Sequence, residues 1–185
     1  MKPSARDFFD KLVPTACTGL FGAYGVALQG RPPTPPADAP EVCSGGLITF
    51  SSDAVSGSLL LVGTFGFLAA SRPRDLRHKA LAMSSSADWI LVRDWSMELV
   101  NQLFGRIRNQ LYRHDVRLAA KAPTAVSGAA LGVAMRMRGS KPYEFTTPER
   151  QVIRLWFEAK VSSTFEPGVA RSIPEIANEG DYVAF

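Results

Sequence analysis

The segment from about 87 to 113 constrains the fold of this 185-residue chain more than any other segment. Its apolar side chains recur every three or four residues, which is the period of an α-helix with one buried face. The serines at 84–86 offer side-chain oxygens that can cap its first turn. A helix this long needs a broad apolar surface to cover. Its buried stripe is expected to contain Val92, Trp95, Leu99, Leu103, Ile107 and Leu111.

Three strand-like segments are expected to supply that surface. Segments 46–52 and 57–66 predict a hairpin with its turn at 52–56, and the run GSLLLVGTF is typical of a strand buried on both faces. Segment 151–161 alternates apolar and polar residues, which is the pattern of a strand with one buried face. The apolar side comprises Ile153, Leu155, Phe157, Ala159 and Val161, and the polar side comprises Arg154, Glu158 and Lys160. This strand is also a candidate edge of the sheet.

The other segments predict a mixed architecture. Residues 5–28 have a helical apolar period, although Pro14 and the glycines at 19, 22 and 25 weaken it. The shorter expected elements are a helix at 74–83, extended segments at 116–128 and 129–138, and a turn at 139–142. Taken in order, the elements predict an α+β domain, with a largely antiparallel sheet covered on one side by two long helices plus a short one.

The whole chain, residues 1–185, is predicted to be a single domain. Segment 31–40 holds five prolines in ten positions, which predicts a stiff, extended surface loop. A proline-rich ligand for an aromatic groove is the alternative interpretation of this segment. Residues 163–185 are loop-like and are expected to form a C-terminal extension.

The composition argues against several classes of protein. Apolar residues make up 46% of the chain, too many for a disordered one. The net charge of +4 is too small to indicate a nucleic-acid partner, although an excess of five basic residues within 71–121 suits an acidic protein surface. Neither a secretory signal nor an apolar run long enough for a transmembrane helix is evident. The protein is therefore expected to be cytoplasmic, with no membrane partner.

Common catalytic and metal-binding motifs are missing from the sequence. It contains no G-x-G-x-x-G, Walker A, H-E-x-x-H or G-x-S-x-G pattern. Cys17 and Cys43 are too few for a disulfide scaffold or a zinc site, so two reduced, mostly buried thiols are expected, with one disulfide as the alternative. His78 and His114 each lie beside Lys or Arg and are expected to be solvated surface histidines. No metal site is predicted.

The outward face of the long helix carries a group of residues in register. Asp94, Glu98, Asn101 and Gly105 fall in a narrow wedge about 150° from the buried stripe, because successive residues are about 100° apart. An ordinary solvated helix face has the same character, and the E-x-x-N spacing by itself is weak evidence for a functional site.

The stretch DWSMELVNQLFG, residues 94–105, resembles the signature of the CheX-type phosphatases in the CheC/CheX/FliY family. That signature is Asp or Ser, three residues, Glu, two residues and Asn, with a proline on the next strand. Pro123 stands 22 positions after Asn101, and GSLLL from Gly57 and FFDKLV in the first helix also resemble family segments. The resemblance covers roughly 5–162. Two-site members carry a second Glu/Asn pair on the first helix, but residues 1–40 contain neither residue type, so the chain is similar to the single-site CheX type.

This resemblance implies hydrolysis of the aspartyl phosphate on a phosphorylated CheY-like receiver domain in chemotaxis or motility signalling. It implies that Asn101 orients the attacking water and that Glu98 pairs with the receiver's active-site lysine. The protein would need no cofactor of its own, because the receiver holds the Mg²⁺. A homodimer formed through the sheets is also implied.

Other residues have supporting roles in this interpretation. Asp94 helps docking, Gly105 leaves room for another backbone, and Pro123 is structural. Arg108, with Arg106 and Arg113, steers an acidic receiver pocket or else belongs to a solvated face.

Two alternatives to the phosphatase interpretation remain. One is a non-catalytic module that binds a receiver domain or a flagellar-switch component, and the other is an unrelated α+β domain.

Overall fold

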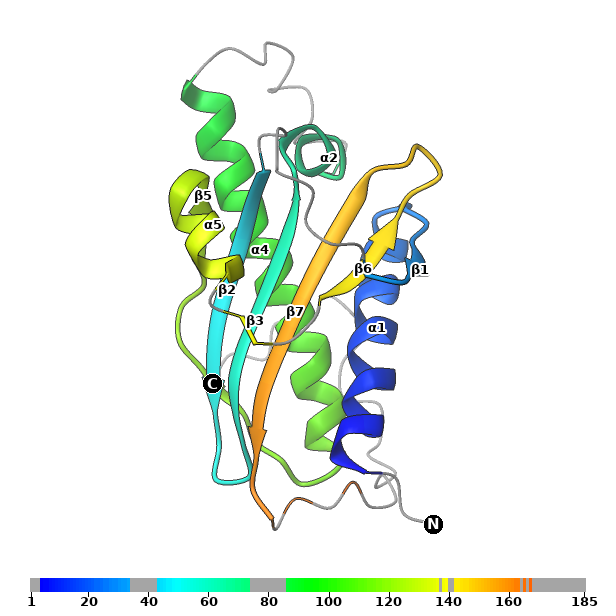
Figure 1. The fold of residues 1–185 in the computed structure, drawn as a ribbon, viewed down its shortest axis with the longest axis vertical. Helices are drawn as coiled ribbons and strands as arrows, with labels where there is room; N and C mark the ends of the chain where they lie inside the picture. The colour runs from blue at the N-terminus through cyan, green and yellow to red at the C-terminus, as the bar shows by residue number, and fades with distance from the viewer. Residues whose placement is uncertain are drawn as a thin grey trace.

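The computed structural model describes residues 4–33, 43–73, 86–136, 138–139, 142–163, 165 and 167. Figure 1 shows an elongated molecule in which a twisted sheet lies against two long helices. The helices are α1 (Ala5–Ala23), α2 (Phe65–Ala70), α4 (Ser86–Tyr112) and α5 (Gly128–Arg136). The strands are β1 (Gln29–Arg31), β2 (Cys43–Ser51), β3 (Val55–Thr64), β4 (Ala119–Ala120), β5 (Thr124–Ser127), β6 (Tyr143–Thr146) and β7 (Val152–Val161).

The strands form one antiparallel sheet. Its order is β1-β6-β7-β3-β2-β4, and β5 also pairs with β2. The predictions of an α+β domain with a largely antiparallel sheet and of the central hairpin are confirmed. The suggestion that 151–161 is an edge is wrong, because β7 pairs with β3 on one side and β6 on the other. Alternation along a strand reports which face is buried and says nothing about its lateral neighbours. The homodimer stays a prediction.

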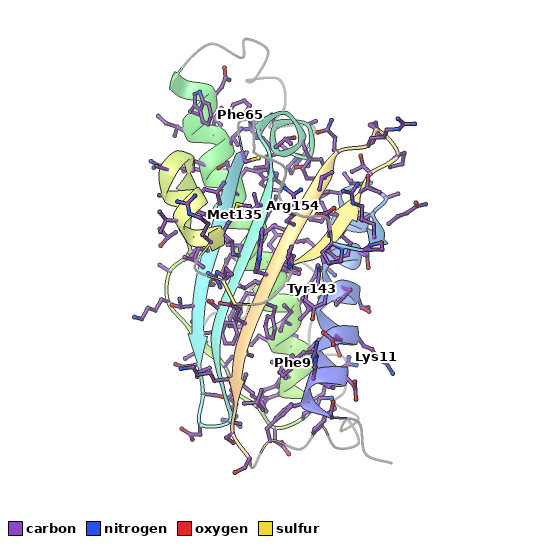
Figure 2. All side chains as sticks on the ribbon, in the orientation of Figure 1. Phe9, Lys11, Phe65, Met135, Tyr143 and Arg154 are labelled. Carbon is purple, nitrogen blue, oxygen red and sulfur yellow. The ribbon has the colours of Figure 1, made fainter. Side chains whose placement is uncertain are left out.

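The helices α1 and α4 cover one face of the sheet and enclose the main core. All six residues of the stripe predicted on the long helix are buried in this core. Phe9 of α1 lies toward the sheet, with its ring centroid 5.0 Å from that of Phe157, whereas Lys11 points away from it (Figure 2). The apolar residues predicted on one side of β7 all pack in or against the same core.

A glycine in β2 lets α4 lie against the sheet. An ideal Cβ at Gly46 would lie only 2.2 Å from the carbonyl oxygen of Ser96 and 2.7 Å from Cγ1 of Val100. Beside it, the Ser96 hydroxyl donates to the carbonyl of Gly45 at 3.2 Å. The position of α4, and with it the direction of its outward face, therefore depends on this close approach.

The first helix begins and ends with specific caps. Ser4 and Asp7 form a capping box at its start, and the helix continues through Pro14. It ends at Ala23, earlier than the predicted end at 28, because Tyr24 caps it and Gly25 has a φ of +74°.

A further helix covers part of the opposite face of the sheet. Residues 129–138 were expected to be extended, but α5 occupies most of this segment. Leu131, Ala134 and Met135 follow a helical period and pack with Trp156 in a second, smaller cluster. Met135 lies between α5 and the sheet in Figure 2. Trp156 is buried on the face of the sheet away from α1 and α4.

Several expected segments lie partly or wholly outside the described residues. These are the short helix at 74–83, most of the proline-rich segment 31–40, part of the turn at 139–142 and most of the extension 163–185. The sequence analysis also missed α2, which starts directly after β3 with Thr64 as its N-cap.

The edge of the sheet beside β2 contains a register shift at Pro123. Ala120 pairs with Phe50 and Thr124 pairs with Leu47, so that residues 121–123 oppose only 48 and 49. One extra residue in an edge strand is a β-bulge, where the missing N–H of proline costs no ladder bond. Pro123 therefore lies at a position where a proline is easily accommodated.

A buried carboxylate joins three strands near the other edge. The Glu144 side chain is fully buried and forms ion pairs with Arg31 and Arg154. The distance from Nε of Arg154 to Oε2 of Glu144 is 2.9 Å. Because both arginines keep some solvent exposure, we expect Glu144→Gln to cost about 2 kcal/mol of unfolding free energy. Urea denaturation measures this, with the exposed Glu149→Gln as control. Equal midpoints for the two variants would contradict the expectation.

Candidate functional site

The predicted site residues lie together on the outward face of α4. Asp94, Glu98, Asn101 and Arg108 are exposed, and an ideal Cβ at Gly105 would meet open space. Residues three and four apart on a helix are neighbours on its surface. The structure therefore brings Glu98 and Asn101 side by side on the solvent-exposed face of α4.

Glu98 is held by a hydrogen-bond chain that starts on another helix. Its Oε1 accepts from Nε2 of Gln102 at 2.6 Å, and Oε1 of Gln102 accepts from the Tyr24 hydroxyl at 2.6 Å. Sequence analysis missed Tyr24 and Gln102. The i,i+4 spacing of Glu98 and Gln102 is a signal that could have revealed the second bond.

The buried side of the helix is fixed just beneath this chain. The Trp95 indole N–H donates to Oγ of Ser71 at 3.0 Å, and the Ser71 hydroxyl donates to the carbonyl of Leu68 at the end of α2. The Trp95 ring also contacts the Tyr24 ring edge-on, with centroids 5.1 Å apart. The part of α4 that carries Glu98 is thereby joined to both α1 and α2.

The arginines near the site differ in orientation. Arg108 and Arg113 are exposed. Arg106 is half-buried, and its Nη1 lies 3.6 Å from where a Cβ of Gly19 would be, so its guanidinium lies against α1. Of the three, Arg108 shares the outward face with Asn101, because a separation of seven residues makes about two helical turns. Pro123 lies on the sheet edge and not on this face.

Other candidates for chemistry are not arranged as a site. His114 is half-buried, with its ring 4.9 Å from the ring of Phe8, so the expectation of a solvated histidine is wrong at this position. His78 lies outside the described residues. Cys17 and Cys43 are both free thiols. Burial raises the pKa of the Cys17 thiol well above its usual range, which keeps it protonated and unreactive.

The described residues contain neither a candidate metal cluster nor a candidate membrane-spanning helix. No group of three or more His, Cys, Asp or Glu side chains is arranged there to hold a metal ion. Within the same part of the chain, no helix has the length and apolar character needed to cross a membrane.

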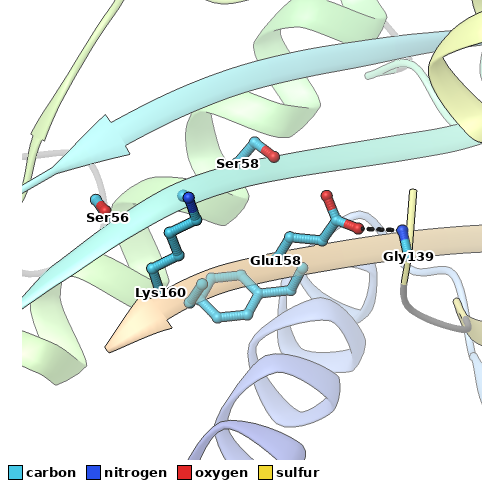
Figure 3. Close-up of a pocket in the computed structure, with 8 residues that line it drawn as sticks. Ser56, Ser58, Gly139, Glu158 and Lys160 are labelled. Carbon is cyan, nitrogen blue, oxygen red and sulfur yellow. Dashed lines mark hydrogen bonds between the residues drawn. The ribbon is translucent and has the colours of Figure 1, made fainter. Parts of the chain in front are cut away.

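A hollow of about 670 Å³ lies on the sheet face opposite α1 and α4 (Figure 3). Ser56, Ser58, Glu158 and Lys160 are among the residues that line it. The Glu158 carboxylate accepts from the N–H of Gly139 at 2.9 Å and from Arg138 at 3.1 Å. The Glu158 carboxylate thus holds residues 138–139 against the sheet, so its role in this hollow is structural.

The sequence and the structure give different results when compared with known proteins. No family model and no curated protein matches the sequence. Among solved structures, CheX from Vibrio vulnificus is 17% identical and has a TM-score of 0.59, with 82% of this chain and 99% of that chain covered. The chain has a CheX-like fold. The predicted fold of the CheC/CheX/FliY family is confirmed.

Two further structures show the same CheX-like fold. CheX in a CheX–CheY–BeF3–Mg²⁺ complex from Borrelia burgdorferi is 12% identical, with a TM-score of 0.60 and coverage of 80% of this chain and 94% of that chain. A CheC-like superfamily protein from a Shewanella species is 16% identical, with a TM-score of 0.57 and the same coverage. At these identities the likeness is one of fold.

Proposed function

We propose that this protein is a phosphatase that hydrolyses the aspartyl phosphate of a CheY-like receiver domain in chemotaxis or motility signalling. The observation that carries the proposal is the pair Glu98 and Asn101, exposed one turn apart on the long helix of a CheX-like fold. A CheX of this fold has been solved in complex with CheY, which supports a receiver domain as the class of partner.

The Asn101 side chain suits the chemistry that the receiver lacks. An acyl phosphate is already labile, and a receiver holds its own Mg²⁺ and lysine next to the phosphoryl group. What remains is to hold a water molecule in line with the phosphorus. A carboxamide can do so with one donor and one acceptor, and it needs no pKa near neutrality. The water-orienting glutamine of GTPases has a similar task.

Glu98 and its neighbours suit docking. A carboxylate on the same face, one turn before Asn101, can pair with the receiver's lysine and set the register of the two proteins. Gly105 also favours close approach of a partner. A glycine inside a helix costs about 1 kcal/mol relative to alanine, and an alanine side chain would meet open space here. Packing against the described residues therefore gives no reason for a glycine at position 105, whereas the close approach of a partner's backbone would give one.

The proposal is tested by measuring loss of phosphate from a panel of phosphorylated CheY-like receivers, with Mg²⁺, in the presence and absence of this protein. Faster loss from one receiver is the expected result. Binding without faster loss would show a docking module and contradict the phosphatase. A chain that neither binds nor dephosphorylates any receiver would contradict the proposal as a whole.

We expect Glu98→Gln to weaken binding of the phosphorylated receiver by about tenfold or more, because it removes one partner of a charge-assisted contact. Surface plasmon resonance at fixed salt measures the affinity. Glu149→Gln removes the same charge from an exposed residue on the β6–β7 connection and serves as the matched control. Equal affinity of the Glu98→Gln variant and the wild type would exclude the ion pair with the receiver.

A further inference from the structure

Glu98 is linked to the first helix by two consecutive hydrogen bonds. The Tyr24 hydroxyl donates to Gln102, which lies 78 positions later in the chain. Gln102 in turn donates to Glu98, which lies one turn earlier on α4. Both donor–acceptor distances are 2.6 Å. A candidate site residue is therefore held from outside its own helix.

Donor and acceptor chemistry fixes the direction of this chain. An ionised carboxylate only accepts hydrogen bonds, so Gln102 must turn its NH₂ group toward Glu98. Its carbonyl oxygen then faces Tyr24, whose hydroxyl donates to it. With the amide turned over, two oxygens would face each other with no proton between them. The observed arrangement is the one that satisfies all three groups.

The starting point of the chain is anchored, whereas its end point is exposed. The backbone N–H of Tyr24 donates to carbonyls of the last turn of α1, and the Tyr24 ring packs edge-on against buried Trp95. Trp95 is itself fixed by its bond to Ser71. Glu98, in contrast, is exposed, and an unrestrained glutamate on a helix surface samples several rotamers.

We infer that Tyr24 and Gln102 are positioning residues for Glu98, an inference that rests on the proposed function. They hold Oε1 of Glu98 on the Gln102 side and leave Oε2 for the lysine of the receiver. Ordering the carboxylate before docking removes part of the entropy that binding would otherwise lose. Neither Tyr24 nor Gln102 touches the reacting atoms.

Two variants separate positioning from packing. Tyr24→Phe removes only the hydroxyl and keeps the ring contact with Trp95, whereas Gln102→Ala removes the amide. Each is expected to raise the KM for the phosphorylated receiver about threefold to tenfold with kcat unchanged, because docking and not the water is affected. The matched control is Gln110→Ala, an exposed glutamine of the same helix, which should leave both constants unchanged.

A double-mutant cycle tests whether the effect passes through Glu98. In the Glu98→Ala background, Tyr24→Phe should not raise the KM further. An equal rise in both backgrounds, or an unchanged KM for Tyr24→Phe alone, would overturn the inference.

A measurement on the free protein keeps this inference separable from the proposed function. The proton scalar couplings of the Glu98 side chain should indicate one rotamer in the wild type and rotamer averaging in Tyr24→Phe. Unchanged couplings would overturn the positioning role whatever the partner. If the wild type bound no receiver, the proposed function and its KM effects would fail, and the couplings alone would decide whether Tyr24 positions Glu98.

Discussion

Replacing Asn101 by alanine is expected to abolish the acceleration of receiver dephosphorylation, a loss of about a hundredfold or more, while receiver binding stays close to that of the wild type. The carboxamide is proposed to orient the attacking water, and alanine offers neither a donor nor an acceptor for it. Because Asn101 is exposed on α4 and packs no core, its removal should not unfold the protein. The assay is decay of the phosphorylated receiver, run in parallel with a binding measurement.

The control for this variant is another exposed asparagine of the same helix. Asn109→Ala removes the same carboxamide about 12 Å farther along α4, at about 1.5 Å per residue, and should leave hydrolysis unchanged. Hydrolysis that persists in the Asn101→Ala variant would exclude the water-orienting role. A parallel loss of binding would instead show that Asn101 acts as a docking residue.

Replacing Gly46 by alanine is expected to lower the unfolding free energy by about 3 kcal/mol or more. The added methyl group would lie 2.2 Å from the carbonyl oxygen of Ser96, a backbone atom that cannot move alone. The helix α4 must then shift away from β2 and leave part of its buried stripe poorly packed. Urea denaturation followed by circular dichroism measures the loss.

Gly22→Ala is the matched control for this change. Gly22 lies in α1, and a Cβ there would meet no atom of the described residues within 4 Å, so alanine should leave stability unchanged or raise it slightly. Because the site residues are carried by α4, we also expect Gly46→Ala to weaken receiver binding even where the protein stays folded. A Gly46→Ala variant as stable as the wild type would contradict the close contact between α4 and β2.

The elements with one buried face were predictable because burial leaves a periodic pattern in the sequence. The stripe from Val92 to Leu111 and the apolar side of β7 are both found in the main core. The outward face of α4 follows from the same geometry, since 100° per residue sets Glu98 and Asn101 opposite the stripe. The extended interpretation of 129–138 failed because a short apolar run fits both a strand and a helix until its partner is known.

The sequence by itself therefore determined the helices α1 and α4, the central strands and the candidate pair on α4. Tertiary structure alone decided that β7 is internal and that α5 covers part of the second face. It also decided that His114 is half-buried and that Tyr24 reaches Glu98 through Gln102. The physical reason is the range of the interactions. The burial of one face of an element leaves a periodic pattern among residues that are close in the sequence. Strand pairing, in contrast, uses backbone groups that every residue type except proline carries, so it leaves no such pattern. Contacts between helices depend on how segments distant in the sequence pack together.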